Sequence, residues 1–185
     1  LLWPSLPSLD VLTDYRPKIP LRIYSAEGEL IGEFGEEKRA VVKIKDVPQV
    51  MKAAILAAED DRFYQHGGVD YLGMVRAAAA NLQGRREGAS TITMQVARTF
   101  FLTREKTFAR KLSEVLLSFK IEANLTKDQI LELYINQIFL GQRAYGFASA
   151  ANVYFGKTLP ELTPAEAALL AGLPQAPSRQ HPCVN

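Results

Sequence analysis

The sequence predicts a mainly α-helical (α+β) domain that begins with a short β-hairpin. Apolar residues recur at helical spacing over several segments between Asp46 and Ala171. Residues that cap helix N-termini precede these segments, whereas a strand–turn–strand pattern occurs near the N-terminus. With 185 residues, 48% of them hydrophobic, the chain is long enough for one compact domain, with or without a small lobe.

Charge and cysteine content narrow the class of protein. The formal net charge is only +2, but lysines and arginines cluster between Arg85 and Lys120. This pattern favours a locally bound anion over nucleic acid. The single cysteine, Cys183, excludes an internal disulfide framework and a cysteine-based metal cluster. No stretch is apolar for long enough to span a bilayer.

Both ends of the sequence are predicted to be linkers. Four prolines lie within residues 1–20, which is typical of extended chain. We expect these residues to follow a membrane anchor that this piece of chain lacks. Residues 21–173 are expected to form the domain, and residues 174–185 to begin a second linker.

The hairpin is expected where Leu21–Tyr24 and Glu29–Phe34 flank a turn at residues 25–28. A third strand is possible at Ala40–Ile44. Beyond it, Asp46 is expected to cap a helix with Pro48 in its first turn. The other expected helices are one from Asp70 to Leu82 stopped by Gly84, one opened by Ser90 or Thr91, one over Thr103–Asn124, one from the Thr126–Gln129 capping box to Gly141, and one that follows the Thr163–Glu166 capping box.

The first group of candidate functional residues is the run from Glu59 to Gly68. Three carboxylates, an arginine and a histidine follow a mostly apolar helix there. A carboxylate such as Glu59 at the end of an apolar stripe is suited to act as a general base. Spacing alone favours an ordinary polar helix terminus in which His66 makes a local hydrogen bond, and a metal site is less favoured still.

The second group is the turn of small residues that begins at Gly88 and leads into a helix. Free N–H groups and the helix dipole favour an anion at such an N-terminus. Thr91, Gln95 and Arg98 are predicted to share one helix face. Spacing alone is also typical of an ordinary N-cap followed by a polar stripe. The turn lacks the residues of a Walker loop and of a nucleophile elbow.

The third group is Arg110, Lys111 and Glu114, which the helical repeat places on one face. Ordinary ion pairs on a helix surface have the same spacing and contribute only about 0.3–0.5 kcal/mol each. Spacing alone therefore favours a structural role for these three residues.

Taken in their order along the chain, these patterns resemble those of the family 51 glycosyltransferases. These are the peptidoglycan glycosyltransferase domains of class A penicillin-binding proteins. The likeness runs from about Leu21 to the end and departs from the common pattern at Ala89 and Met94. It consists of Glu-Asp-x-x-Phe-x-x-His-x-Gly at 59–68, Gly-x-Ser-Thr-Ile-Thr-x-Gln at 88–95, Arg-Lys-x-x-Glu at 110–114, and the blocks at 130–141 and 151–157.

The resemblance implies a lysozyme-like helical domain with a small membrane-facing lobe. It implies inverting transfer that polymerises lipid II into β-1,4-linked glycan strands and releases undecaprenyl diphosphate. Glu59 would be the general base, in a pocket shaped by Asp60, Phe63 and His66. Glu114 would be a second catalytic carboxylate that orients cations or assists at the phosphates. The implied substrate-binding residues also include Ser90, Thr91, Gln95, Arg98, Arg110, Lys111 and Asn136.

The resemblance also implies partners and a location. These are lipid II, the growing lipid-linked glycan, other cell-wall synthesis proteins and the periplasmic face of the bacterial inner membrane, with no nucleic acid. No cofactor and no protein-built metal site are expected, although Mg²⁺ or Mn²⁺ could share the diphosphate. Four apolar residues suit either membrane contact or the core: Phe100, Phe101, Leu102 and Phe108. Transpeptidase motifs are absent from the sequence, so the second linker would lead to an absent transpeptidase domain.

Two other functions stay open. A lysozyme-like enzyme that cleaves glycan would use a single glutamate as a general acid, but it has no diphosphate to hold with a basic cluster. A non-catalytic module that binds lipid II or cell wall would not need both Glu59 and Glu114.

Overall fold

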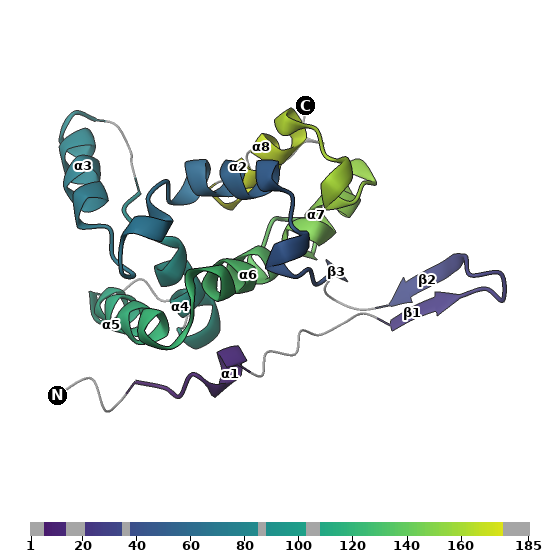
Figure 1. Ribbon diagram of the computed structural model, residues 1–185, viewed down its shortest axis with the longest axis horizontal. Coiled ribbons are helices and arrows are strands. Elements are labelled where there is room, and N and C mark those ends of the chain that lie inside the picture. The colour runs from purple at the N-terminus through teal and green to yellow at the C-terminus, as the bar shows by residue number, and fades with distance from the viewer. Residues whose placement is uncertain (1–5, 14–20, 35–37, 85–87, 103–107, 176–185) are drawn as a thin grey trace. The chain divides into compact units, whose positions relative to one another are not determined.

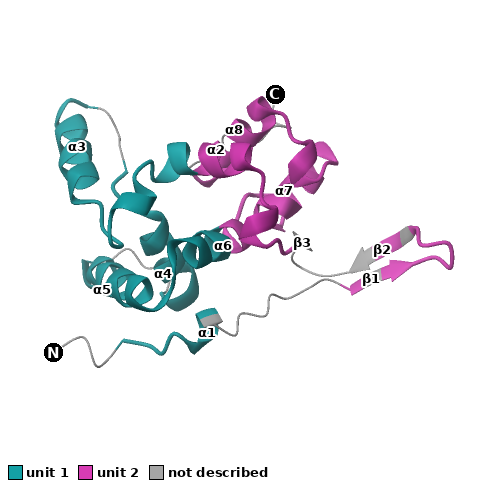
Figure 2. Ribbon diagram, viewed as in Figure 1, with its two compact units in different colours: residues 1–14, 56–134 teal, residues 15–55, 135–185 magenta. Residues whose placement is uncertain are grey.

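The computed structural model describes residues 6–13, 21–34, 38–84, 88–102 and 108–175, and most of these are helical (Figure 1). Two compact units divide the chain: residues 1–14 with 56–134, and residues 15–55 with 135–185 (Figure 2). Helices α2, Gln49–Glu59, and α6, Lys127–Gln137, each begin in one unit and end in the other. The predicted mainly helical fold is confirmed.

The predicted N-terminal hairpin is also confirmed. Strands β1, Leu21–Tyr24, and β2, Leu30–Phe34, pair in antiparallel register with Leu21 opposite Phe34. The turn closes with a hydrogen bond from Ser25 N to Glu29 O at 2.7 Å. Gly28 takes a φ of +88° there, which side chains with a Cβ rarely adopt.

The third strand predicted at Ala40–Ile44 is wrong. Strand β3 covers only Lys38–Arg39 and pairs in parallel with β4, Ala144–Tyr145. At Val42, in the middle of the predicted segment, the side-chain amide of Asn136 takes the place of a neighbouring strand. Val42 N donates to Asn136 Oδ1 at 2.9 Å, and Asn136 Nδ2 donates to Val42 O at 2.8 Å. These bonds satisfy the polar backbone of Val42 without a ladder.

In the first unit, the caps are those that the sequence predicts. Helix α3, Tyr71–Leu82, begins after Asp70, whose carboxylate accepts from Gly73 N at 2.9 Å. Helix α4, Ile92–Phe101, begins after Thr91, whose hydroxyl accepts from Met94 N at 3.2 Å. Helix α5, Phe108–Asn124, packs against α4 and ends at the predicted residue. Its predicted first turn, residues 103–107, lies outside the described residues. The short segments α1, Asp10–Thr13, and η3, Phe63–Gln65, complete this unit.

Two predicted helix ends are wrong. Asp46 lies in the 3₁₀ helix η2, Ile44–Asp46. It does not cap α2, because the first backbone hydrogen bonds of α2 run from Met51 N and Lys52 N to the carbonyl of Pro48. Helix α6 ends at Gln137 and not at Gly141, because the carbonyl of Ile138 accepts from Gly146 N at 2.8 Å. The Thr126–Gln129 capping box that starts α6 is confirmed.

The second unit ends in α7, Phe147–Phe155, η4, Leu159–Glu161, α8, Pro164–Gly172, and η5, Leu173–Gln175. The Thr163–Glu166 capping box of α8 is confirmed. Lys157 Nζ lies 2.7 Å from Glu166 Oε1 and ties the end of α7 to this cap.

Each unit has its own apolar core. Fully buried side chains of the first unit include Phe63, Ile92, Met94, Leu117, Ile121, Ile130 and Leu131, and those of the second include Met51, Ile55, Ile135, Leu140, Phe147 and Leu170. Met51 and Ile55 form the apolar stripe of α2 that leads to Glu59. Within the described ranges, no helix combines the length and the hydropathy needed to cross a membrane.

We predict that Gly146→Ala destabilises the fold by about 2 kcal/mol or more. Gly146 has φ +84° and ψ 156°, a conformation that costs residues with a side chain about 1–3 kcal/mol. A Cβ there would lie 2.8 Å from Asn136 O and 2.9 Å from Ile135 O. Urea unfolding measures the effect. Gly67→Ala is the control, because its Cβ would meet no atom within 4 Å and its φ is not positive. Equal stability of the two variants would contradict the prediction.

Candidate active site

Glu59 lies at the last position of α2, half-buried, as the apolar stripe predicts. Its Oε2 accepts a hydrogen bond of 2.7 Å from Gln95 Nε2 on α4. Gln95 is buried, with 7% of its surface exposed, and follows the N-cap residue Thr91 by one helical turn. The fold therefore brings together two predicted site residues that are 36 positions apart in the sequence.

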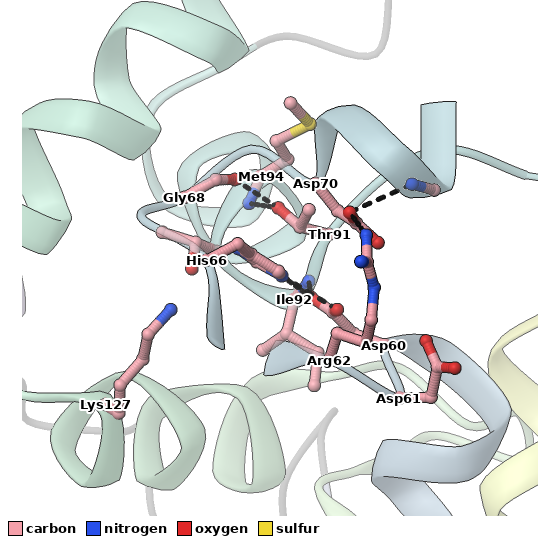
Figure 3. A network of polar contacts seen from close by, with 12 residues as sticks. Asp60, Asp61, Arg62, His66, Gly68, Asp70, Thr91, Ile92, Met94 and Lys127 are labelled. Carbon is pink, nitrogen blue, oxygen red and sulfur yellow. Dashed lines mark hydrogen bonds and ion pairs between the residues drawn. The ribbon is translucent and has the colours of Figure 1, made fainter. Parts of the chain in front are cut away.

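Asp60 joins the loop after α2 to the start of α4 (Figure 3). Its carboxylate lies 2.8 Å from His66 Nε2 and accepts from Ile92 N at 3.1 Å. Asp60 is 6% exposed, so these two partners replace water around its carboxylate. The local hydrogen bond that the sequence suggested for His66 is confirmed.

Further contacts hold the same loop in place. Thr91 Oγ1 donates to Gly68 O at 2.6 Å, and Arg62 pairs with Asp70, the cap of α3 (Figure 3). Gly68 has φ +88°, and a Cβ there would lie 3.1 Å from Ser118 on α5. The loop therefore has a fixed shape that two helix caps and one glycine maintain.

Phe63 is a core residue of this loop. Its side chain is fully buried, and the ammonium of Lys127 lies 4.3 Å from the centre of its ring. Lys127 also pairs with Glu122 at 2.7 Å, which in turn accepts from Thr93 Oγ1 at 2.6 Å. The structure thus packs Phe63 in the core of the unit, and its predicted role in shaping a substrate pocket stays a prediction.

The predicted cluster of cations surrounds a buried carboxylate. Glu114 is 1% exposed, with Arg110 Nε 3.4 Å from its Oε1 and Lys111 Nζ 3.0 Å from its Oε2. Lys111 also donates to Ser90 Oγ at 2.8 Å, next to the cap of α4. The alternative of an ordinary surface ion pair is therefore wrong for Glu114. The side chain of Lys111 is 44% exposed, so its positive charge is accessible to a ligand in solvent.

Tyr134 is a residue of this region that the sequence did not single out. It is 2% exposed on α6. Burial raises its pKa well above the ordinary value, the charge of Glu59 raises it further, and Arg98 opposes the rise. Glu59 and Arg98 therefore both lie within electrostatic reach of Tyr134. In the sequence, Tyr134 has the spacing of any other apolar position of α6, and no local pattern indicates that the fold brings it near Glu59.

Asn136 belongs to the second unit, where both ends of its amide bind the backbone of Val42. Of the aromatic residues that suited membrane or core, Phe108 is 98% exposed, and Phe100, Phe101 and Leu102 are half-buried. Among the residues that the structure describes, no three histidine, cysteine or acidic side chains are grouped to hold a metal ion.

Comparison with known proteins identifies the family of this chain. Residues 27–185 match a protein family described as "Transglycosylase". The chain belongs to the transglycosylase family. The peptidoglycan glycosyltransferase class that the sequence predicted is thereby confirmed, and this transglycosylase domain is an enzyme domain.

Individual relatives agree with the family. The transglycosylase domain is 60% identical over 185 residues to penicillin-binding protein 1A of Neisseria gonorrhoeae and 53% identical over 186 residues to that of Pseudomonas aeruginosa. The two alignments cover 99% and 100% of this chain, but only 23% of each relative. A crystal structure of penicillin-binding protein 1A from Haemophilus influenzae is 34% identical, with a TM-score of 0.42 over 88% of this chain and 15% of that one.

We predict that Asp60→Ala destabilises the domain by about 2 kcal/mol or more, because it leaves the buried Ile92 N–H and His66 Nε2 without their acceptor. The matched control is Asp61→Ala at the next position. The Asp61 side chain is 50% exposed and lies 3.5 Å from Arg76, so its loss should change stability by less than about 0.5 kcal/mol. Chemical unfolding of both variants measures the difference, and an equal loss in both would refute the role given to Asp60.

Proposed function

We propose that this transglycosylase domain polymerises lipid II into β-1,4-linked glycan strands and releases undecaprenyl diphosphate. The observation that supports this most directly is the contrast between two carboxylates of one compact unit. Glu59 is hydrogen-bonded to a neutral amide, whereas Glu114 is paired with two cations. Carboxylates in contrasting environments are suited to different catalytic roles.

Glu59 is the general base in this proposal. Its carboxylate takes the proton from the 4-hydroxyl of the acceptor sugar while that oxygen attacks C1 of the donor sugar. The bond between C1 and the diphosphate oxygen breaks with its electron pair leaving on the diphosphate. Attack from the opposite face inverts the anomeric centre. A glutamate at a fixed position supports this role, because proton transfer requires hydrogen-bond distance to the hydroxyl.

The cations on α5 stabilise the leaving diphosphate. Lys111 lies beside Ser90 at the start of α4, and its side chain is partly open to solvent. Positive groups that are held in place before the reaction stabilise negative charge as it develops on the leaving oxygen. Glu114 holds Arg110 and Lys111 in position from the buried side of the helix. We propose that no cofactor is required, and a divalent cation could share the diphosphate with these residues.

Contact with the outer leaflet of the inner membrane follows from a lipid-linked substrate. Exposed apolar side chains support it: Phe108 on α5, and Tyr71, Leu72, Val75 and Leu82 on α3. Apolar side chains of this kind insert at the boundary between headgroups and acyl chains. The family resemblance of the sequence is the other basis on which we propose this location.

A glycan-cleaving enzyme is the second candidate, since one glutamate can also act as a general acid. The cluster of Arg110, Lys111 and Ser90 favours transfer over cleavage, because cleavage of finished glycan leaves no diphosphate to stabilise. Incubation with lipid II in detergent tests the proposal, and formation of polymeric glycan is the expected result. Release of soluble fragments from purified cell wall, without polymer, would support the second candidate instead.

We predict that Glu59→Gln abolishes polymerisation and leaves the fold intact, because an amide of the same shape accepts no proton at neutral pH. Lipid II polymerisation and thermal unfolding are measured on one preparation. Turnover near the parent rate in a folded variant would rule out Glu59 as the base.

We predict that Glu114→Gln lowers turnover by about tenfold to a thousandfold, because Arg110 and Lys111 lose the charge that orients them. Binding of lipid II should fall much less. Glu122→Gln is the matched control, because Glu122 lies on the same helix and also pairs with a lysine, Lys127, at 2.7 Å. A similar loss of turnover in both variants would show that the effect is one of stability.

A further inference from the structure

We propose that Gln95 is a positioning residue that holds the carboxylate of Glu59, and is not a ligand of the leaving diphosphate. This inference rests on the proposed role of Glu59 as general base. The 2.7 Å hydrogen bond from Gln95 Nε2 to Glu59 Oε2 has the length of a bond to an ionised acceptor. It fixes the position of one oxygen of the carboxylate and thereby restricts where the other can lie.

The position of Gln95 itself is fixed by α4. All residues from Thr91 to Ala97 are buried, and the helix begins with the side-chain cap of Thr91. The carbonyl of Gln95 accepts a further hydrogen bond from Thr99 Oγ1 at 2.9 Å. With 7% of its surface exposed, Gln95 presents its amide to Glu59 inside the unit and not to solvent. A ligand of the substrate would need an open polar end.

The neutral charge of Gln95 suits the chemistry of a base. An amide that donates one hydrogen bond orients a carboxylate without cancelling its charge, whereas Lys111 and Arg110 do cancel that of Glu114. Among the described residues, Tyr134 on α6 lies within electrostatic reach of both Glu59 and Arg98. Burial and the charge of Glu59 raise the pKa of Tyr134, which keeps its phenol neutral. The adjacent Asp60 carboxylate is occupied by His66 and Ile92 N.

The decisive variant is Gln95→Met, which keeps the length of the side chain and removes the donor. A misoriented base slows the chemical step, so kcat for lipid II should fall about tenfold to a hundredfold. KM should change little, since substrate binding is retained. The acid limb of the pH–rate profile should move to higher pH, because the carboxylate loses a donor that stabilises its charged form.

A second variant, Gln95→Glu, gives an independent measurement. Its carboxyl group donates to Glu59 only while protonated, so its activity relative to the parent should fall as the pH rises. Thr99→Val is the matched control, because it removes the bond to the backbone oxygen of Gln95 and leaves the amide untouched. Its kcat and pH profile should match those of the parent.

The same experiment separates the possible failures. A raised KM with unchanged kcat in Gln95→Met would overturn the inference and restore Gln95 as a diphosphate ligand. Unchanged kcat and KM in a folded Gln95→Met would overturn it as well. If Gln95→Met does not fold, an unchanged pH profile of Gln95→Glu overturns the inference. Activity of Glu59→Gln, by contrast, would refute the proposed function itself.

Discussion

The geometry of the candidate site depends on the bonds that Asp60 makes. Its carboxylate joins the residue directly after Glu59 to His66 and to the first backbone N–H of α4. Glu59 and Gln95 extend from the two chain segments that this carboxylate connects, so their 2.7 Å hydrogen bond requires that connection. A buried carboxylate with two partners is costly to disrupt, because each partner would be left without an acceptor. The loop consequently holds Glu59, the proposed base, in one place.

The second constraint is the difference in charge around the two glutamates. Both lie in the first unit and both are shielded from water to some degree; Glu114 has Arg110 and Lys111 as direct partners, and Glu59 accepts from the neutral amide of Gln95. A carboxylate between two cations is suited to hold those cations in position. The amide of Gln95 orients the carboxylate of Glu59 without adding a charge beside it. In the proposed mechanism, one helical unit thus supplies both a base for the attacking hydroxyl and a positive site for the leaving group.

Local signals predicted much of this arrangement. Caps such as Asp70, Thr91 and Thr163 act within a few residues, so the sequence alone placed the starts of α3, α4 and α8 correctly. The wrongly predicted strand came from a long-range bond: Asn136 satisfies the backbone of Val42, 94 residues away, and removes the need for a strand there. The pairing of Gln95 with Glu59 and the burial of Glu114 depend on packing between helices, which periodicity does not specify.

The start of α4 shows how such packing changes the meaning of a motif. A turn of small residues before a helix is suited to bind an anion through free N–H groups. Here Ile92 N donates to Asp60 and Met94 N donates to Thr91 Oγ1, so a carboxylate of the protein itself occupies the end of the helix. Since Gln95 is also engaged, the proposed mechanism assigns the diphosphate to groups beside this turn. Lys111, bonded to Ser90 at 2.8 Å and partly open to solvent, provides such a group. The bonds of this turn therefore fix the start of α4, and with it Gln95, relative to the loop that follows Glu59.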